Sequence, residues 1–496
     1  MEIMKIKSIY QYIVVALITC ITVSCSDYLK EEPYSQLAPE NFLKTKEGIE
    51  SLMGAAYANA SNMISNNSIY VFAADEWITD FAFQSGDGVN ATAVQYINFT
   101  WDASIGLLQG ESWDYPYRAI RNANLVLENL EELEDSEENK MVYRAEARFI
   151  RAISYIKLYW KFGTVPLRIS SDDELQLPRA SDEELTAFIE TELLAALQDL
   201  PAPGEEANYG RAHKAAAQGW LSNFYLNNKE WQKSADFASQ IMDQWNYGLF
   251  PVYEDLFKVE NERNNEYIWV RPAKTSADRS ASNSWMNTAF PVGFASDPRT
   301  GLEFSNSWRN WPNEFRIRDN FYFSFGENDN RRNLILHEYI NTEGDLISLL
   351  DEPDNTRSFK YWPDPEGVNA SFGNDIPEIR FAEILLNRAE ALNELNGPNQ
   401  ESIDLINRIR ARAGMDAPLK LSDFASKEAL RMQILDERGW EFYSEGKRRL
   451  DLIRMDKLIE FAHARGATNA KPFHRLYPIP FATLDANPLL TQNEGY

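Results

Sequence analysis

Apolar residues recur every three or four positions along most of this chain, the spacing that places them on one face of a helix. The clearest pattern lies over 141–162 and ends at Gly163, a residue that favours a helix terminus. Ser181 and Glu184 form a capping box, which predicts a helix that ends before Pro201. The same spacing predicts helices over 42–64, 113–133, 213–227, 231–245, 377–395, 402–413, 426–443 and 447–464.

Several of these helices are joined by short turns and are expected to pair as hairpins. Residues 228–230 form one such turn, and Gly219 with Ala215, Ala216 and Ala217 should let the second helix approach the first. Hairpins of about 34 residues are typical of tetratricopeptide repeats, and three or more of them bury a shared core. We therefore predict a mainly α fold: a tetratricopeptide-like scaffold of about four helical hairpins, with long irregular inserts and a few short strands.

Two long segments interrupt the helical pattern, namely the first insert (residues 69–108) and the second insert (residues 269–372). Both are rich in Gly, Asn, Ser, Asp and aromatic residues and show little helical spacing. Segments of this length without regular structure usually carry function. Short strands are expected near them, for example over 267–270.

The net charge of the chain excludes one class of function, the binding of nucleic acid. Its 496 residues include 75 acidic and 49 basic residues, for a net charge of −26. Nucleic-acid binding needs a basic surface and is therefore excluded. The arginines near the C-terminus stand close to acidic residues, so we expect ion pairs on helix surfaces; they are Arg408, Arg410, Arg412, Arg448 and Arg449.

The sequence contains no motif that predicts catalysis or a cofactor. Nucleophile elbows, zinc-protease helices and phosphate-binding glycine loops are all missing from it. The four histidines are scattered, which disfavours a metal centre. The acidic run 351–355 has the oxygen ligands that a structural calcium ion needs, but it lacks the ordered spacing of a calcium loop, so a solvated turn is the favoured interpretation. We predict a protein that is not an enzyme.

The first residues have the layout of an export signal. Lys5 and Lys7 precede an uncharged stretch with an apolar centre at 13–18, which predicts a signal peptide over 1–24. Residues 22–25 resemble a bacterial lipoprotein box, in which Cys25 would be acylated; Cys20 is the rival site, and simple secretion is the alternative. Acyl chains on Cys25 would hold the mature protein at a membrane.

Several segments together resemble the SusD/RagB family, the nutrient-binding outer-membrane lipoproteins of Bacteroidetes. They occur in the order WDYPYRAI (113–120), RAEARFIRA (144–152), FGTVPL (162–167), IRFAEILLNRAEA (379–391), INRIRARAG (406–414), ERGWEF (437–442), RRLDL (448–452) and LYPIP (476–480). The resemblance implies one compact body with an N-terminal region over 25–265 and a C-terminal region over 266–496. The latter would contain a ligand-facing insert (266–375) and helical hairpins (376–465).

The resemblance also implies a function. Such a protein is anchored by lipid at the cell surface, binds an oligosaccharide, and passes it to a SusC-like TonB-dependent transporter of the outer membrane. Glycan fragments are the commonest cargo of the family, and peptides are the cargo in its RagB branch. Peptide capture therefore stays an alternative, as does a helical-repeat interaction scaffold, which predicts that the inserts are packed shut. The sequence does not specify the glycan or its linkage.

The inserts contain the residue types that bind sugars. A pyranose has an apolar face and a rim of hydroxyl groups, so its sites combine flat aromatic rings with a few planar hydrogen-bonding groups. We expect exposed aromatic rings from both inserts to form a glycan platform; the competing interpretation is that each indole is a core anchor. The candidate residues are Trp77, Asp80, Asn90, Trp101, Trp285, Asn287, Trp308, Arg309 and Trp311.

Overall fold

Helices make up about half of the protein in the computed structural model, 51% against 8% strand, so the mainly α prediction is confirmed. The structure describes residues 39–61, 68–84, 86, 88–276 and 281–496. Residues 1–38, including the predicted signal peptide and Cys25, lie outside this range. None of the helices in the described part is both long and apolar enough to span a membrane.

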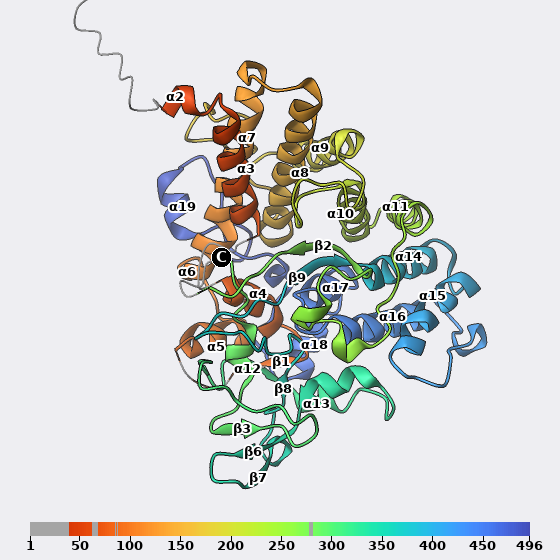
Figure 1. Ribbon diagram of the computed structural model, residues 1–496. Coiled ribbons are helices and arrows are strands. Elements are labelled where there is room, and N and C mark those ends of the chain that lie inside the picture. Colours follow the sequence, from red (N-terminus) through yellow and green to blue (C-terminus); the bar gives the residue numbers. More distant parts are fainter. Residues whose placement is uncertain (1–38, 62–67, 85, 87, 277–280) are drawn as a thin grey trace, which may run out of the picture.

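The N-terminal helices form a layered bundle (Figure 1). In this bundle α3 packs on α7, α7 on α8, and α8 on α9. The Ser136 hydroxyl accepts a hydrogen bond from the Asn139 amide at the start of α8, and Gly163 ends this helix with a φ of 72°. The Ser181–Glu184 capping box is confirmed at the start of α9. The bounds are α2 (Pro39–Phe42), α3 (Lys46–Ala60), α7 (Tyr115–Asn129), α8 (Glu137–Phe162) and α9 (Asp182–Asp199).

Two further groups of helices continue the scaffold. The predicted pair α10 (Lys214–Asn227) and α11 (Trp231–Gln244) is confirmed, and α11 also packs on α14. Gly219 does not provide the predicted close approach of α11. A Cβ built on Gly219 would lie 2.9 Å from Ile379 Cδ1, so the missing side chain allows α10 to pack closely against strand β9. The C-terminal helices are α14 (Phe381–Asn396), α15 (Gln400–Arg412), α16 (Lys427–Phe442), α17 (Arg448–Arg454), α18 (Leu458–Ala464) and α19 (Phe481–Ala486).

Two predicted helices differ from the structure. Residues 376–380 form strand β9 (Ile376–Arg380), and the helix begins only at Phe381. The predicted helix over 447–464 is two helices, because Asp456 adopts a left-handed φ of 57° and the Lys457 amide donates to Leu452 O over 2.7 Å, which closes a turn. In both places the apolar pattern continues through a change of backbone direction, so the pattern alone does not predict the change.

Strands β2 (Tyr267–Arg271) and β9 pair antiparallel through the middle of the molecule (Figure 1). The expected strand at 267–270 is therefore confirmed. One hydrophobic cluster extends through both halves of the chain, from Ala56 to Leu490. The division into regions 25–265 and 266–496 stays a prediction.

The inserts contain more regular structure than the sequence indicates. The first insert contains α4 (Ser68–Trp77), β1 (Ala82–Phe83), α5 (Asn90–Asn98) and the start of α6 (Gly106–Gln109), and the π-helical turn η2 (Gly110–Asp114) follows it. The second holds α12 (Trp285–Ala289), β3 (Phe294–Ser296), β4 (Arg316–Ile317), α13 (Asp319–Tyr322), β5 (Ile335–Leu336), β6 (Glu338–Asn341), β7 (Leu346–Ser348) and β8 (Arg357–Ser358). Their helices are too short to show helical spacing in sequence.

Candidate functional site

The two inserts meet through a short strand pair. Ala82 of β1 lies opposite Ile317 of β4, and Phe83 lies opposite Arg316. The Arg318 amide also donates to Phe81 O over 2.8 Å. Segments more than 200 residues apart in sequence therefore share one surface, as the joint platform requires.

Four of the predicted platform tryptophans are buried. Trp77, Trp285, Trp101 and Trp308 are 0%, 1%, 3% and 9% exposed. The Trp101 indole donates to the hydroxyl of Tyr496 over 2.9 Å. For these four residues the predicted exposure is wrong, because the indoles pack against other aromatic rings: Trp285 and Trp308 within the second insert, and Trp101 against both the first insert and the C-terminal residues His474 and Tyr477. This packing agrees with the competing interpretation of the indoles as core anchors.

Two of the predicted polar residues have structural partners. The buried Asn287 amide donates to Asn369 O over 3.2 Å and to Arg309 O, which fixes two segments of the second insert. Asp80 accepts hydrogen bonds from Arg448 Nε over 2.9 Å and from Arg448 Nη2 over 2.7 Å, and so joins the first insert to α17. Asn90 begins α5 and is half-buried.

The other two predicted residues reach the surface. Arg309 is exposed and Trp311 is half-buried. Their backbone amides donate to Asn369 O over 2.7 Å and to Asn287 O over 2.6 Å, which holds the segment in place. Trp311 forms no ring-to-ring contact with another aromatic side chain of the described chain, which distinguishes it from the four buried tryptophans.

Asn313 links this segment to the first insert. A Cβ built on Gly86 would lie 3.9 Å from Asn313 Cβ, so the two inserts nearly touch here. Asn313 adopts a left-handed φ of 71°, a conformation that asparagine tolerates better than most residues. We call the surface formed by Phe83, Arg309, Trp311 and Asn313 the junction face.

Arginines gather beneath the junction face. The Arg318 guanidinium lies 5.0 Å from the Phe83 ring centroid and pairs with Asp354 over 3.2 Å. Asp354 belongs to the acidic run for which a calcium ion was considered, and here it accepts hydrogen bonds from Arg318 and from the Asp319 amide. No group of acidic, histidine or cysteine side chains suited to a metal ion occurs among the described residues.

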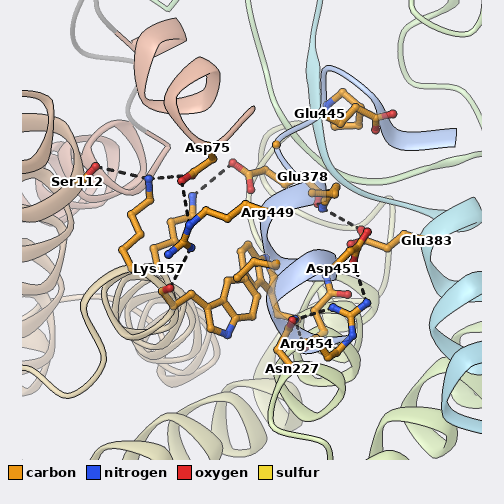
Figure 2. Close-up of a pocket in the computed structure, with 18 of the residues that line it drawn as sticks. Asp75, Ser112, Lys157, Asn227, Glu378, Glu383, Glu445, Arg449, Asp451 and Arg454 are labelled. Atoms are coloured by element: carbon orange, nitrogen blue, oxygen red, sulfur yellow. Dashed lines mark hydrogen bonds and ion pairs between the residues drawn. The ribbon is translucent and has the colours of Figure 1, made fainter. Parts of the chain in front are cut away.

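A separate polar cavity of about 150 Å³ lies between the N-terminal bundle and the C-terminal helices (Figure 2). Lys157 and Lys161 of α8 enter it from one side, and Glu378 of β9 and Arg449 of α17 from the other. Lys161 pairs with Asp75 over 2.9 Å, and Lys157 pairs with Glu378 over 3.3 Å. Most charges that line this cavity therefore already have a partner within the protein.

Ion pairs across this cavity connect the two halves of the chain. Burial alone would raise the pKa of Glu378, but Lys157, Arg271 and Lys447 outweigh burial and bring the pKa down to about 2. Burial lowers the pKa of Lys157, and Glu378 opposes that effect. Because its charges are paired with one another, this cavity offers a ligand few unpaired polar groups, and its ion pairs connect the two halves of the chain.

Comparison with known proteins shows to which family this chain belongs. The model of the SusD family matches residues 254–496, and a model described as starch-binding associating with outer membrane matches residues 27–226. This chain belongs to the SusD family. The SusD-like protein P25 of Formosa agariphila is 26% identical over 99% of this chain and all of the relative. The starch-binding protein SusD of Bacteroides thetaiotaomicron is 25% identical over 82% of each chain.

Solved structures of the SusD family share the fold. A laminarin-binding SusD-like protein superposes with a TM-score of 0.77 at 22% identity, covering 91% of this chain and all of that one. A SusD superfamily protein of Parabacteroides distasonis gives a TM-score of 0.76 at 24% identity, over 93% of this chain and all of the other. The predicted membership and fold class are therefore confirmed.

Sequence reasoning missed several residues at or beneath the junction face. Arg316 and Arg357, which lie beneath the junction face, were not singled out. Phe83 and Asn313 belong to the aromatic and polar residues of the inserts, but they were not among the candidate residues. One signal was available: residues 309–318 contain three arginines among Trp311, Phe315 and two asparagines, a density unusual in so acidic a chain. Arg357 carries no such signal, because only the fold brings it to this place.

Proposed function

We propose that this protein is a surface lipoprotein of the outer membrane that captures an oligosaccharide at the junction face and presents it to a SusC-like TonB-dependent transporter. The β1–β4 pairing carries this proposal, because it joins both inserts into one face that includes the Trp311 indole. The printed names of relatives that bind starch and laminarin support a glycan as the cargo. In this proposal Cys25, which precedes the described residues, carries the lipid.

Binding without reaction suits such a task. A carrier must release its cargo, and one stacked ring contributes only about 1 kcal/mol beyond its buried area. Trp311 would supply the stacking surface, while Arg309 and Asn313 would donate or accept hydrogen bonds at the sugar hydroxyl groups. We propose that the glycan leaves the junction face chemically unchanged.

Affinity electrophoresis in gels that contain starch, laminarin, xylan or dextran tests the proposal. The wild-type protein should be retarded by at least one glycan, and Trp311→Ala should weaken that binding about threefold to tenfold. Phe481→Ala is the matched control, because Phe481 is a 66% exposed aromatic residue on α19, outside the inserts. Unchanged retardation of a folded Trp311→Ala protein would reject the junction face as the site.

Two further measurements address cargo and partner. Native mass spectrometry of protein purified from its own cells should show bound hexose or pentose oligomers; bound peptides would favour the RagB-type alternative instead. Purification in mild detergent should recover a TonB-dependent barrel with the wild-type protein. Cys25→Ala should abolish incorporation of labelled palmitate, and persistent labelling would contradict the predicted anchor.

A further inference from the structure

Arg357 is a buried cation without an acidic partner. The side chain is 1% exposed and belongs to strand β8, beneath the junction face. Its Nη2 donates to Asn313 Oδ1 over 3.0 Å and to Asn355 Oδ1 over 2.8 Å. Its Nε and Nη1 have no hydrogen-bond acceptor, and within the described chain no carboxylate forms an ion pair with it.

Such an arrangement is unfavourable in a protein without ligand. A buried charge is normally paired, and an unpaired one costs several kcal/mol of desolvation. Burial and the neighbouring Arg316 lower the pKa of Arg357 to about 9, which shows how poorly its surroundings compensate the charge. In a chain with 75 acidic residues a carboxylate partner would be readily available, so its lack at this position calls for an explanation.

Asn313 brings a second guanidinium to the same point. Its Oδ1 accepts hydrogen bonds from Arg357 over 3.0 Å and from Arg316 over 2.7 Å. One neutral amide oxygen therefore lies between two cationic donors, in the position that an oxyanion would occupy with charge-assisted hydrogen bonds. Asn313 is half-buried and forms part of the junction face, so this point lies directly under the proposed glycan.

The backbone holds the two arginines in place. Arg316 is on β4 and Arg357 is on β8, and the Ile317 amide donates to Thr356 O over 2.8 Å between these strands. Thr356 itself is buried, and its hydroxyl donates to Ile317 O over 3.2 Å. Donors fixed before a ligand arrives lose little entropy when it binds, which is the requirement for a selective anion site.

We propose that Arg357 and Arg316 recognise an anionic substituent of the bound glycan, either a sulfate ester or a carboxylate. The inference rests on the proposed function, because it names the class of glycan that the junction face takes. An oxyanion on the sugar would displace the Asn313 amide oxygen or lie beside it, and would accept hydrogen bonds from the unused donors of Arg357. The planar guanidinium matches both kinds of anion.

The overall charge of the protein makes the test selective. With a net charge of −26 the molecule as a whole repels polyanions, so retention on an acidic polymer requires a specific local site. Affinity electrophoresis of the full chain would use laminarin, xylan and dextran, each unmodified, carboxymethylated and sulfated, at about 150 mM salt. The carboxymethyl and sulfate forms distinguish the two anions on matched backbones.

Two variants test the assignment by different routes. Arg357→Met removes the unpaired charge, and Asn313→Asp supplies an internal carboxylate that competes with the ligand. Wild-type protein should bind one anionic form at least tenfold more tightly than its neutral parent, and both variants should abolish this preference. Arg121→Met removes an equal charge from an exposed position of α7 and should keep the preference.

The outcomes separate this inference from the proposed function. Tight binding of neutral glycans with no preference for any anionic form would overturn the anion site and leave glycan capture standing. Binding of none of the nine polymers, nor of starch, would overturn both. A preference that survives in folded Arg357→Met and Asn313→Asp proteins would overturn the assignment to these residues.

Discussion

Two sets of buried arginines in this molecule have opposite surroundings. In the C-terminal helical core, Arg380 pairs with Glu266, Glu441 and Glu445 at 2.6–2.8 Å, and all of these side chains are at most 1% exposed. Arg331 of the second insert reaches the same core, where it pairs with Asp329, Glu437 and Glu441. Beneath the junction face, Arg357 is just as buried, but among the described residues its hydrogen-bond partners are amide oxygens alone.

The difference indicates two uses of the same side chain. A buried guanidinium surrounded by carboxylates is complete within the protein and fixes the positions of the elements that supply them. A buried guanidinium surrounded by amides is incomplete, and its charge is available to an anion from outside. The core charges therefore belong to the stability of the scaffold, and Arg357 belongs to recognition in our proposal.

Removing one carboxylate from the core should have the largest effect. Glu441→Gln leaves Arg331, Arg380 and Arg412 with too few anions, since Glu441 contacts all three. Breaking a buried ion pair from one side typically costs about 3–5 kcal/mol, so the free energy of unfolding should fall by that amount. Urea denaturation followed by tryptophan fluorescence measures it, and a loss under 1 kcal/mol would contradict the view that these charges support the fold.

Acid should lower the free energy of unfolding by protonating Glu378, which pairs with Lys157 in the polar cavity. The folded pKa of about 2 lies below the unfolded value of about 4.5, so the stabilisation is present above pH 4.5 and is lost as the pH falls towards 2. A shift of this size corresponds to roughly 3 kcal/mol. Denaturation of wild type and Glu378→Gln between pH 6 and 2.5 should show a difference that shrinks with acidity, and a constant difference would contradict the assignment.

The sequence predicted the scaffold better than the site, for physical reasons. Helices such as α8 and α9 were recognised because their apolar stripe and their caps are local properties of the chain. The break at Asp456 and the strand β9 were missed, because the apolar pattern continues through both. The C-terminal arginines were expected on helix surfaces, but Arg410, Arg412, Arg448 and Arg449 are buried and pair with acidic residues, some of them distant in sequence.

The site depends on contacts that sequence does not show. Residue type suggested aromatic platforms, and the two inserts do meet, but burial of Trp77, Trp101, Trp285 and Trp308 is decided by packing in the folded chain, which for Trp101 includes C-terminal residues. Arg316 and Arg357 share Asn313 only because β4 and β8 lie side by side. The fold therefore decides both which aromatic rings are buried and which residues a buried arginine contacts. Neither follows from the neighbours in sequence.

Giving the junction its own carboxylate should make it resemble the core. Asn313→Asp keeps the shape of the side chain and places an anion between Arg316 and Arg357, and aspartate tolerates the left-handed backbone of this position. Hydrogen bonds to charged groups contribute about 1.5–3 kcal/mol, part of which desolvation of the new carboxylate offsets. We expect the free energy of unfolding to rise by about 1 kcal/mol in urea denaturation. A decrease would show that the junction is not short of negative charge.

Removing Arg357, which has no carboxylate partner in the described part of the chain, should change the free energy of unfolding least. It is also the most direct test of the difference between the two sets of arginines. Arg357→Met deletes a buried charge that no carboxylate balances, and replacing buried charges with apolar groups of similar volume is often neutral or stabilising. The free energy of unfolding should therefore change by less than about 1 kcal/mol, whereas Arg380→Met, equally buried, should lose about 3–5 kcal/mol because three glutamates lose their partner. Equal losses in the two variants would mean that both arginines serve stability, and the distinction between the regions would fail.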